Sequence, residues 1–276
     1  MRSRTVTGGD GVEIHVEERG PADAHPLLLI HGFSQSRLAW TPQFDSTLAD
    51  DYRLVAMDLR GHGASGTPDD PDAYRDAALW AADVRAVVEG LDLDQPTLVG
   101  WSYGGLVVSD YLATHGDGAV SGVVLVGGIT EKGTADADRF AGERFVALDS
   151  GFRSTDAAES VDTLAEFVRL CVEDPLDDPA FYRALGYNAA VPPFVRAALQ
   201  DRTVAHEATL SDVETPVLLI HGTADPVVRP AAAEKHADLF PNARLETYGD
   251  VGHSPFFEAP ERFEADLRTF VEDGND

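Results

Sequence analysis

The residues best placed to do chemistry lie in a short motif at residues 100–104, which reads Gly-Trp-Ser-Tyr-Gly. This Gly-x-Ser-x-Gly pattern lets the backbone turn sharply from a strand into a helix, so that the serine hydroxyl is lifted into the open. Alone the pattern is weak, because a chain with 25 glycines can produce it by chance. The expected strand before it (96–99) and helix after it (106–112) are both present as apolar segments. The sequence therefore predicts that Ser102 is a nucleophile.

A serine hydroxyl becomes nucleophilic when a base takes its proton and a carboxylate holds that base in the correct tautomer. Nine histidines are present, and we assign the base role to His253, which lies in a flexible turn between the last strand and the last helix. We assign the acid role to Asp225, which follows the strand that ends at His221. The order along the chain is therefore nucleophile, acid, histidine.

Simpler interpretations of these residue types exist. His31 and His221 lie at strand ends beside glycines and are expected to stabilise turns. Asp225 precedes a proline, where an aspartate commonly forms a turn. Glu131, just beyond another strand, is a fallback for the acid.

The elements that must position these residues are visible as hydrophobic patterns. Continuous apolar runs predict strands covered on both faces, and the alternating run 12–17 predicts a half-buried strand. The buried runs are 26–30, 54–57, 123–126 and 217–222. Helices are predicted over 73–90, 231–239 and 261–272, with a strand near 244–248. Strands alternating with helices predict the α/β class, with a mostly parallel central sheet and helices on both faces.

Residues 129–215 separate two of the predicted strands and contain helical patterns at 163–170 and 193–199. A structureless loop of that length is implausible inside a compact domain. We therefore predict a helical cap over 129–215, inserted into a core made of 1–128 and 216–276.

The composition narrows the class of partner. The formal net charge is −27, and 19 of the 21 basic residues are arginine. Such an acidic chain repels phosphate backbones and anionic membranes, so we expect neither nucleic acid nor a membrane as a partner. High salt screens the self-repulsion of so many carboxylates. The composition thus favours a halophilic protein adapted to a salty cytoplasm.

Cys171 is the single cysteine, which excludes an intrachain disulfide and favours a reducing compartment. No segment has the order of charges and apolar residues typical of a signal peptide, and the apolar runs have the length of strands. We expect a soluble, cytoplasmic protein. The oligomeric state does not follow from these features.

Five motifs in chain order resemble those of the α/β-hydrolase fold family. They are His31-Gly32-Phe33, Asp58-Leu59-Arg60-Gly61-His62-Gly63, Gly100-Trp101-Ser102-Tyr103-Gly104-Gly105, His221-Gly222-Thr223-Ala224-Asp225 and Gly252-His253-Ser254. The resemblance covers nearly the whole chain. It points to the branch of capped esterases, enol-lactonases and cofactor-free haloperoxidase-like enzymes.

The resemblance also implies an oxyanion hole, because in that family two backbone N–H groups hold the oxyanion. They belong to the residue after His-Gly and the residue after the nucleophile, which are Phe33 and Tyr103 in this chain. Haloalkane dehalogenases and epoxide hydrolases of this fold carry an aspartate where this chain has Ser102. The serine therefore favours acyl transfer.

The substrate pocket is predicted less directly. Trp101, Val227 and Phe256 neighbour the catalytic residues in the sequence and are candidates for substrate binding, with ordinary core packing as the alternative. No metal-ligand spacing and no complete dinucleotide-binding fingerprint occurs, so neither a metal nor a cofactor is expected.

These observations predict a serine hydrolase that cleaves carboxylic esters or lactones through an acyl-enzyme. The same triad also suits a C–C bond hydrolase or a haloperoxidase-like perhydrolase. A non-enzymatic alternative is a ligand receptor that has kept the hydrolase scaffold, since fold alone does not determine function.

Overall fold

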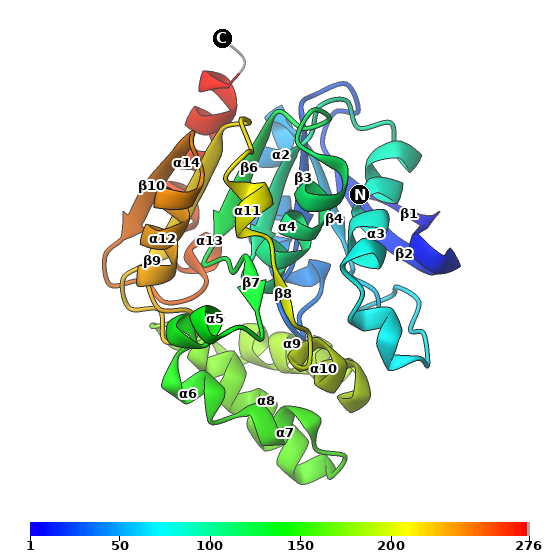
Figure 1. Cartoon of the computed structure of the whole chain (residues 1–276), viewed down its shortest axis with the longest axis vertical. Helices are drawn as coiled ribbons and strands as arrows, with labels where there is room; N and C mark the ends of the chain where they lie inside the picture. Colours follow the sequence, from blue (N-terminus) through cyan, green and yellow to red (C-terminus); the bar gives the residue numbers. More distant parts are fainter. Residues whose placement is uncertain (275–276) are drawn as a thin grey trace.

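The computed structural model describes residues 1–274, which are organised around an eight-stranded sheet (Figure 1). In spatial order the strands are β1 (Arg2–Thr7), β2 (Glu13–Arg19), β4 (Arg53–Met57), β3 (Pro26–Ile30), β5 (Thr97–Trp101), β6 (Gly122–Val126), β9 (Val217–Gly222) and β10 (Ala243–Tyr248). The pairs β1–β2 and β2–β4 are antiparallel, and the other pairs are parallel. The predicted α/β class with a mostly parallel sheet is confirmed.

The central strands are buried because their sequences are apolar on both faces. Every residue of β3, β4, β5, β6 and β9 is buried. A parallel strand covered by helices on both sides has no solvent-facing side, which explains the continuous apolar runs. These strands fall within one residue of the predicted ranges, apart from β5, which extends to Trp101.

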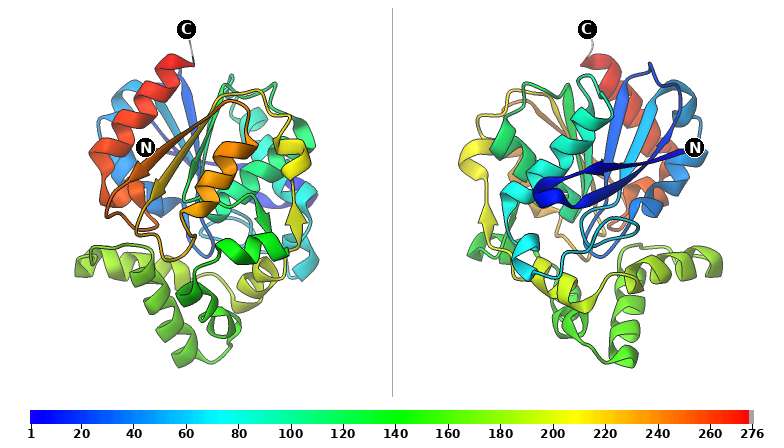
Figure 2. Two further views of the ribbon diagram at one scale, coloured as in Figure 1. Left: turned by 60° about the vertical axis from the view of Figure 1, so that its left-hand side comes forward. Right: turned by 90° about the vertical axis from the view of Figure 1, so that its right-hand side faces the viewer.

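Helices cover both faces of the sheet (Figure 2). The helices of the core are α1 (Thr41–Asp45), α2 (Leu48–Asp51), α3 (Ala77–Gly90), α4 (Tyr103–His115), α12 (Ala231–Leu239), α13 (Pro255–Glu258) and α14 (Pro260–Asp273), with short 3-10 helices η1 (Gly9–Gly11), η2 (Arg37–Trp40) and η3 (Pro71–Tyr74). In both views α14 lies on one face, and α3, α4 and α12 lie on the other.

Two features differ from the sequence prediction. The helix expected from residue 73 begins at Ala77, because the Asp76 side chain caps it by accepting a hydrogen bond from the Ala78 N–H. The residues before it form η3 instead. Strand β1 was not predicted, since it is an exposed edge strand with a single apolar residue, Val6.

A helical insert separates β6 from β9. Its elements are β7 (Glu131–Lys132), α5 (Ala135–Phe140), α6 (Glu143–Val146), α7 (Asp149–Arg153), α8 (Ala157–Leu170), α9 (Asp178–Ala189), α10 (Pro193–Gln200), β8 (Val204–Ala205) and α11 (Glu207–Leu210). Its helices α6–α10 lie beyond one end of the sheet, whereas α11 lies beside α4 (Figure 1). The expected helical insertion is present. No helix within residues 1–274 has the length and apolar character needed to cross a membrane.

A buried polar cluster fastens this insert to α4, the helix that follows Ser102. The Arg202 guanidinium donates to both carboxylate oxygens of Asp110, at 2.9 and 2.7 Å. The His206 ring contacts the same carboxylate at 2.8 Å, and Arg202 also donates to the Tyr103 hydroxyl at 3.2 Å. The insert is therefore tied to the element that carries the predicted nucleophile.

Candidate active site

Ser102 lies at the sharp turn between β5 and α4, with φ 54° and ψ −117°. This backbone conformation is strained for a residue with a side chain. The turn is possible because its glycines touch backbone: a Cβ at Gly100 would lie 2.7 Å from the Gly104 carbonyl carbon, and one at Gly104 would lie 2.3 Å from the Ile30 oxygen. Such an elbow places the serine hydroxyl beyond the end of the sheet.

Asp225 and His253 come together from two loops after β9 and β10. The Nδ1 atom of His253 lies 2.7 Å from Oδ2 of Asp225, and both side chains are buried. The other oxygen, Oδ1, accepts hydrogen bonds from the backbone N–H groups of Val227 and Val228. This arrangement fixes both the carboxylate and the imidazole.

The electrostatics keep the carboxylate ionised. Burial alone would raise the pKa of Asp225, but the charge of His253 and the hydrogen bonds from His221 and His253 outweigh burial and lower this pKa. An ionised carboxylate stabilises the imidazolium that forms when histidine accepts a proton.

The second ring nitrogen of His253 faces no protein partner. Nε2 is buried and forms no hydrogen bond within residues 1–274. The His253 ring lies near the elbow: its centroid is 5.7 Å from the ring of Trp101, the residue before Ser102, and the Trp101 indole N–H donates to the His253 carbonyl oxygen at 2.9 Å. A buried imidazole nitrogen without a protein partner is available to act as a base.

The other candidate residues have different partners. The His31 ring nitrogens bond to the Gly32 carbonyl and the Leu59 N–H, as expected for a turn histidine. His221 contacts the Val228 carbonyl at 2.9 Å and, in addition, Oδ2 of Asp225 at 3.1 Å.

Sequence reasoning missed this second contact of His221 with Asp225, although their spacing of four residues at a strand end was a usable signal. The pKa of His221 would be lowered by burial, but its bond to Asp225 raises it. Glu131, the fallback acid, bonds to Thr134 and Lys235 instead of His253.

The two residues expected to supply the oxyanion amides line the same cavity. Tyr103 is the first residue of α4, so its N–H has no acceptor inside the helix. The loop carrying Phe33 reaches the elbow because its neighbour Gly32 lacks a side chain: a Cβ there would lie 3.1 Å from the Ser102 Cβ. Phe33, Ser102 and Tyr103 all line one cavity of about 90 Å³.

The three predicted pocket residues line two different cavities. Val227 lines the cavity that contains Ser102. Trp101 and Phe256 pack against each other, with ring centroids 5.0 Å apart, and line a second cavity of about 180 Å³. The second cavity is bounded by α8, α9 and the loop after β3, and Cys171 is buried in its wall.

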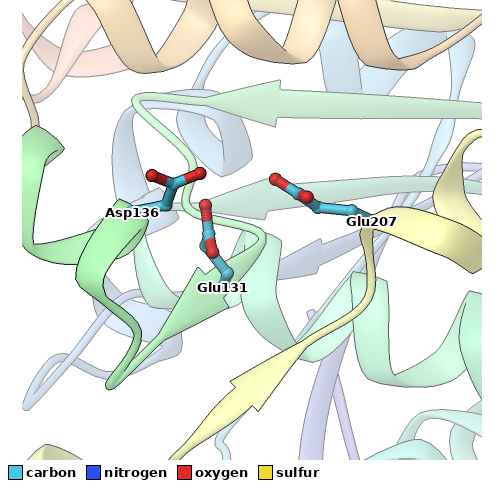
Figure 3. Close-up of side chains that lie close together, drawn as sticks. All are labelled: Glu131, Asp136 and Glu207. Carbon is cyan, nitrogen blue, oxygen red and sulfur yellow. The ribbon is translucent and has the colours of Figure 1, made fainter.

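Three carboxylates from the insert gather next to the first cavity: Glu131, Asp136 and Glu207 (Figure 3). Their oxygen atoms lie within 4.8 Å of one another, a spacing that would suit a metal ion. The ammonium group of Lys235 on α12 contacts all three. The Lys235 ammonium group therefore provides the positive charge for these three carboxylates. Because Lys235 belongs to the core, these contacts also join the insert to the core.

Comparison with known proteins identifies the family. A model of the α/β-hydrolase fold matches residues 25–260. The chain belongs to the α/β-hydrolase fold family, as the resemblance of its motifs implied.

Individual relatives span the whole chain. A non-heme chloroperoxidase of Streptomyces lividans is 32% identical, over 97% of this chain and 99% of the relative. A bifunctional esterase/perhydrolase of Acinetobacter calcoaceticus is 30% identical, over 96% and 98% of the two chains. The crystal structure of an esterase from Rhodococcus sp. ECU1013 superposes with a TM-score of 0.93 at 39% identity, with 99% of each chain covered.

Proposed function

We propose that this protein is a serine hydrolase of carboxylic esters or lactones, with Ser102, His253 and Asp225 as its catalytic triad. The observation that carries the proposal is the hydrogen-bonded Asp225–His253 pair, whose Nε2 has no partner within residues 1–274 and whose ring lies 5.7 Å from that of Trp101, the residue before Ser102. The esterase named among the similar structures and the esterase/perhydrolase among the relatives support the same class.

In this mechanism Nε2 of His253 accepts the Ser102 proton while Oγ attacks the substrate carbonyl carbon. The amides of Phe33 and Tyr103 donate to the oxyanion, each contributing about 2.7 to 4 kcal/mol of transition-state stabilisation. The protonated His253 then gives its proton to the leaving alcohol, and an acyl-enzyme remains. Water, deprotonated by His253, hydrolyses that ester and regenerates the serine.

The cavity lined by Phe33, Ser102 and Tyr103 would hold the acyl part of the substrate, with Val227 also on its wall. We assign the second cavity, lined by Trp101 and Phe256, to the leaving alcohol, because Trp101 adjoins the nucleophile and contacts His253. In this proposal the insert, residues 129–215, is a cap that selects the substrate. We also propose that the protein is cytoplasmic and adapted to high salt.

Pre-steady-state kinetics test the acyl-enzyme directly. Mixing the protein with p-nitrophenyl acetate or butyrate in molar KCl should release a burst of p-nitrophenol that approaches one equivalent per enzyme, if deacylation is slower than acylation. Ser102→Ala should abolish both the burst and the turnover. Tight binding of an ester or lactone with no turnover, unchanged in Ser102→Ala, would favour the receptor hypothesis instead.

Perhydrolysis is a second candidate activity, favoured by the chloroperoxidase and esterase/perhydrolase among the relatives. Hydrogen peroxide would replace water as the nucleophile toward the acyl-enzyme, so that a peracid leaves and Ser102 regains its proton. Peracid formation from an ester and peroxide, measured against hydrolysis of the same ester, gives the ratio of the two reactions. A C–C bond hydrolase would instead cleave a diketone in a panel of substrates and leave simple esters intact.

A further inference from the structure

The two lysines of the chain have opposite surroundings. Lys235 contacts Glu131, Asp136 and Glu207, the three carboxylates drawn in Figure 3. Lys132, on β7, is half-buried, and within residues 1–274 no carboxylate lies within 4.0 Å of its ammonium group. Its single hydrogen bond goes to Oε1 of Gln200, at 2.7 Å. In a chain with 48 acidic residues, a half-buried cation without an ionic partner is unusual.

Lys132 and Gln200 both line the cavity that contains Ser102. Much of the remaining wall is apolar, formed by Phe33, Ile129, Ala137, Phe140, Ala141, Phe145, Val227, Val228 and Ala232, and it also includes the carboxylates of Glu131 and Asp138. Ligand pockets of this kind are mostly apolar, with a few polar groups that fix the orientation of the ligand. Lys132 and Gln200 come from the insert, whereas Ser102 comes from the core.

Of the other ionisable groups on this wall, Glu131 and His236 have protein partners, whereas the exposed Asp138 side chain forms no hydrogen bond or ion pair within residues 1–274. Glu131 bonds to Thr134 and Lys235. The His236 ring contacts the Thr130 hydroxyl at 3.0 Å, and burial lowers its pKa to about 3, so the ring is uncharged at neutral pH. Two of the three ammonium protons of Lys132 and the amide N–H groups of Gln200 form no hydrogen bond within residues 1–274.

Charged groups of both signs act on Lys132. Asp149 and Asp138 favour its protonated form, and Arg153 and Arg202 oppose it. The dominant influence is burial, which lowers the pKa of Lys132 to about 8. Lys132 thus remains protonated at neutral pH, and its own charge is not cancelled locally.

We propose that Lys132 and Gln200 bind a carboxylate at the far end of the acyl group, so that the preferred substrates are half-esters of dicarboxylic acids. This inference rests on the proposed esterase function. A carboxylate has two oxygen atoms that accept hydrogen bonds, and the ammonium and amide groups provide donors for both. The apolar wall would hold the methylene chain between that carboxylate and the ester carbonyl at Ser102.

Matched substrates test the proposal. Monoethyl adipate and ethyl hexanoate have acyl chains of equal length that differ in their far end, carboxylate against methyl. Their kcat/KM ratio, measured by chromatography in 2 M KCl, should fall at least tenfold in Lys132→Met, mainly through a higher KM for the adipate. Lys132→Arg should restore part of the ratio, because it restores the charge.

Arg169→Met is the matched control. It removes one positive charge from the same insert, at an exposed residue that lines neither of the two cavities. Its ratio should equal that of the wild type. If Lys132→Met fails to fold, Lys132→Gln and the wild-type pH profile supply the readout: the preference for the adipate should decline as the pH rises through about 8.

The outcomes separate the two proposals. A ratio that is unchanged by Lys132→Met or Lys132→Gln, with normal hydrolysis of ethyl hexanoate, would overturn the carboxylate site and leave the esterase function intact. Absence of Ser102-dependent hydrolysis of both esters would overturn the esterase function and the carboxylate site with it.

Discussion

At the scale of single residues, Ser102 is both the proposed nucleophile and a residue with an unfavourable backbone conformation. Its positive φ is strained for serine or alanine but not for glycine. Ser102→Ala and Ser102→Gly should both lower kcat by at least about 10⁴-fold. Ser102→Gly should nevertheless unfold at a higher temperature than Ser102→Ala. Equal melting temperatures in calorimetry would show that the elbow is not strained.

Lys132 should reduce the stability of the free protein, because its charge is half-buried and forms no ion pair within residues 1–274. Replacing it by methionine should raise the melting temperature at pH 7 by roughly 2–4 °C, equivalent to about 1 kcal/mol. Because the pKa of Lys132 is lower in the folded protein, the unfolded chain binds more protons than the folded chain between pH 8 and 10.5. The contribution of Lys132 to the free energy of unfolding of the wild type therefore rises across this pH range.

The advantage of the methionine variant should therefore shrink as the pH rises from 8 to 10.5. Thermal melts of the variant and the wild type at pH 7 and pH 10 measure this change. Arg169→Met, which removes an exposed charge, should show no such pH-dependent difference. A methionine variant less stable than the wild type at pH 7 would contradict the argument.

At the scale of elements, the contact between α4 and the insert depends on the buried Asp110–Arg202 pair. Removing one partner leaves the other charge buried, so Asp110→Asn should destabilise the protein by about 3–5 kcal/mol. Activity should fall as well, because Arg202 also bonds to Tyr103 at the elbow. The combined variant Asp110→Leu with Arg202→Met should recover much of the stability in urea unfolding. Single and combined variants of equal stability would show that the pair does not couple the two elements.

The elements also show what sequence can and cannot predict. The buried parallel strands were predictable because each is a continuous apolar run, and the order of Ser102, Asp225 and His253 followed from motifs at their ends. Strand β1 was not predictable, since its edge position leaves it polar. The position of Lys132 beside the Ser102 cavity depends on how the insert folds back onto the core, and no local pattern encodes that.

At the scale of the whole molecule, the net charge of −27 should make stability depend on salt. Carboxylates on one surface repel one another over a Debye length of about 10 Å at 0.1 M salt, which falls to about 3 Å at 1 M. The melting temperature should therefore rise between 0.1 and 2 M KCl.

A variant with fewer surface charges provides the control. Asp50, Asp94 and Asp238 are exposed and form no ion pair within residues 1–274. Changing all three to asparagine should raise the melting temperature in 0.1 M KCl and reduce the further gain in 2 M KCl. A melting temperature that is constant or falls with added KCl in the wild type would contradict the role assigned to the charge.

The central claim is that Ser102 attacks an acyl carbon with His253 as its base. Labelling with an alkyl p-nitrophenyl phosphonate, followed by mass spectrometry of the intact protein and of its peptides, tests this claim most directly. We predict one adduct per chain, located on Ser102, absent from Ser102→Ala and formed at least about 10³-fold more slowly in His253→Ala. No adduct, or an adduct on another residue that persists in Ser102→Ala, would contradict the account.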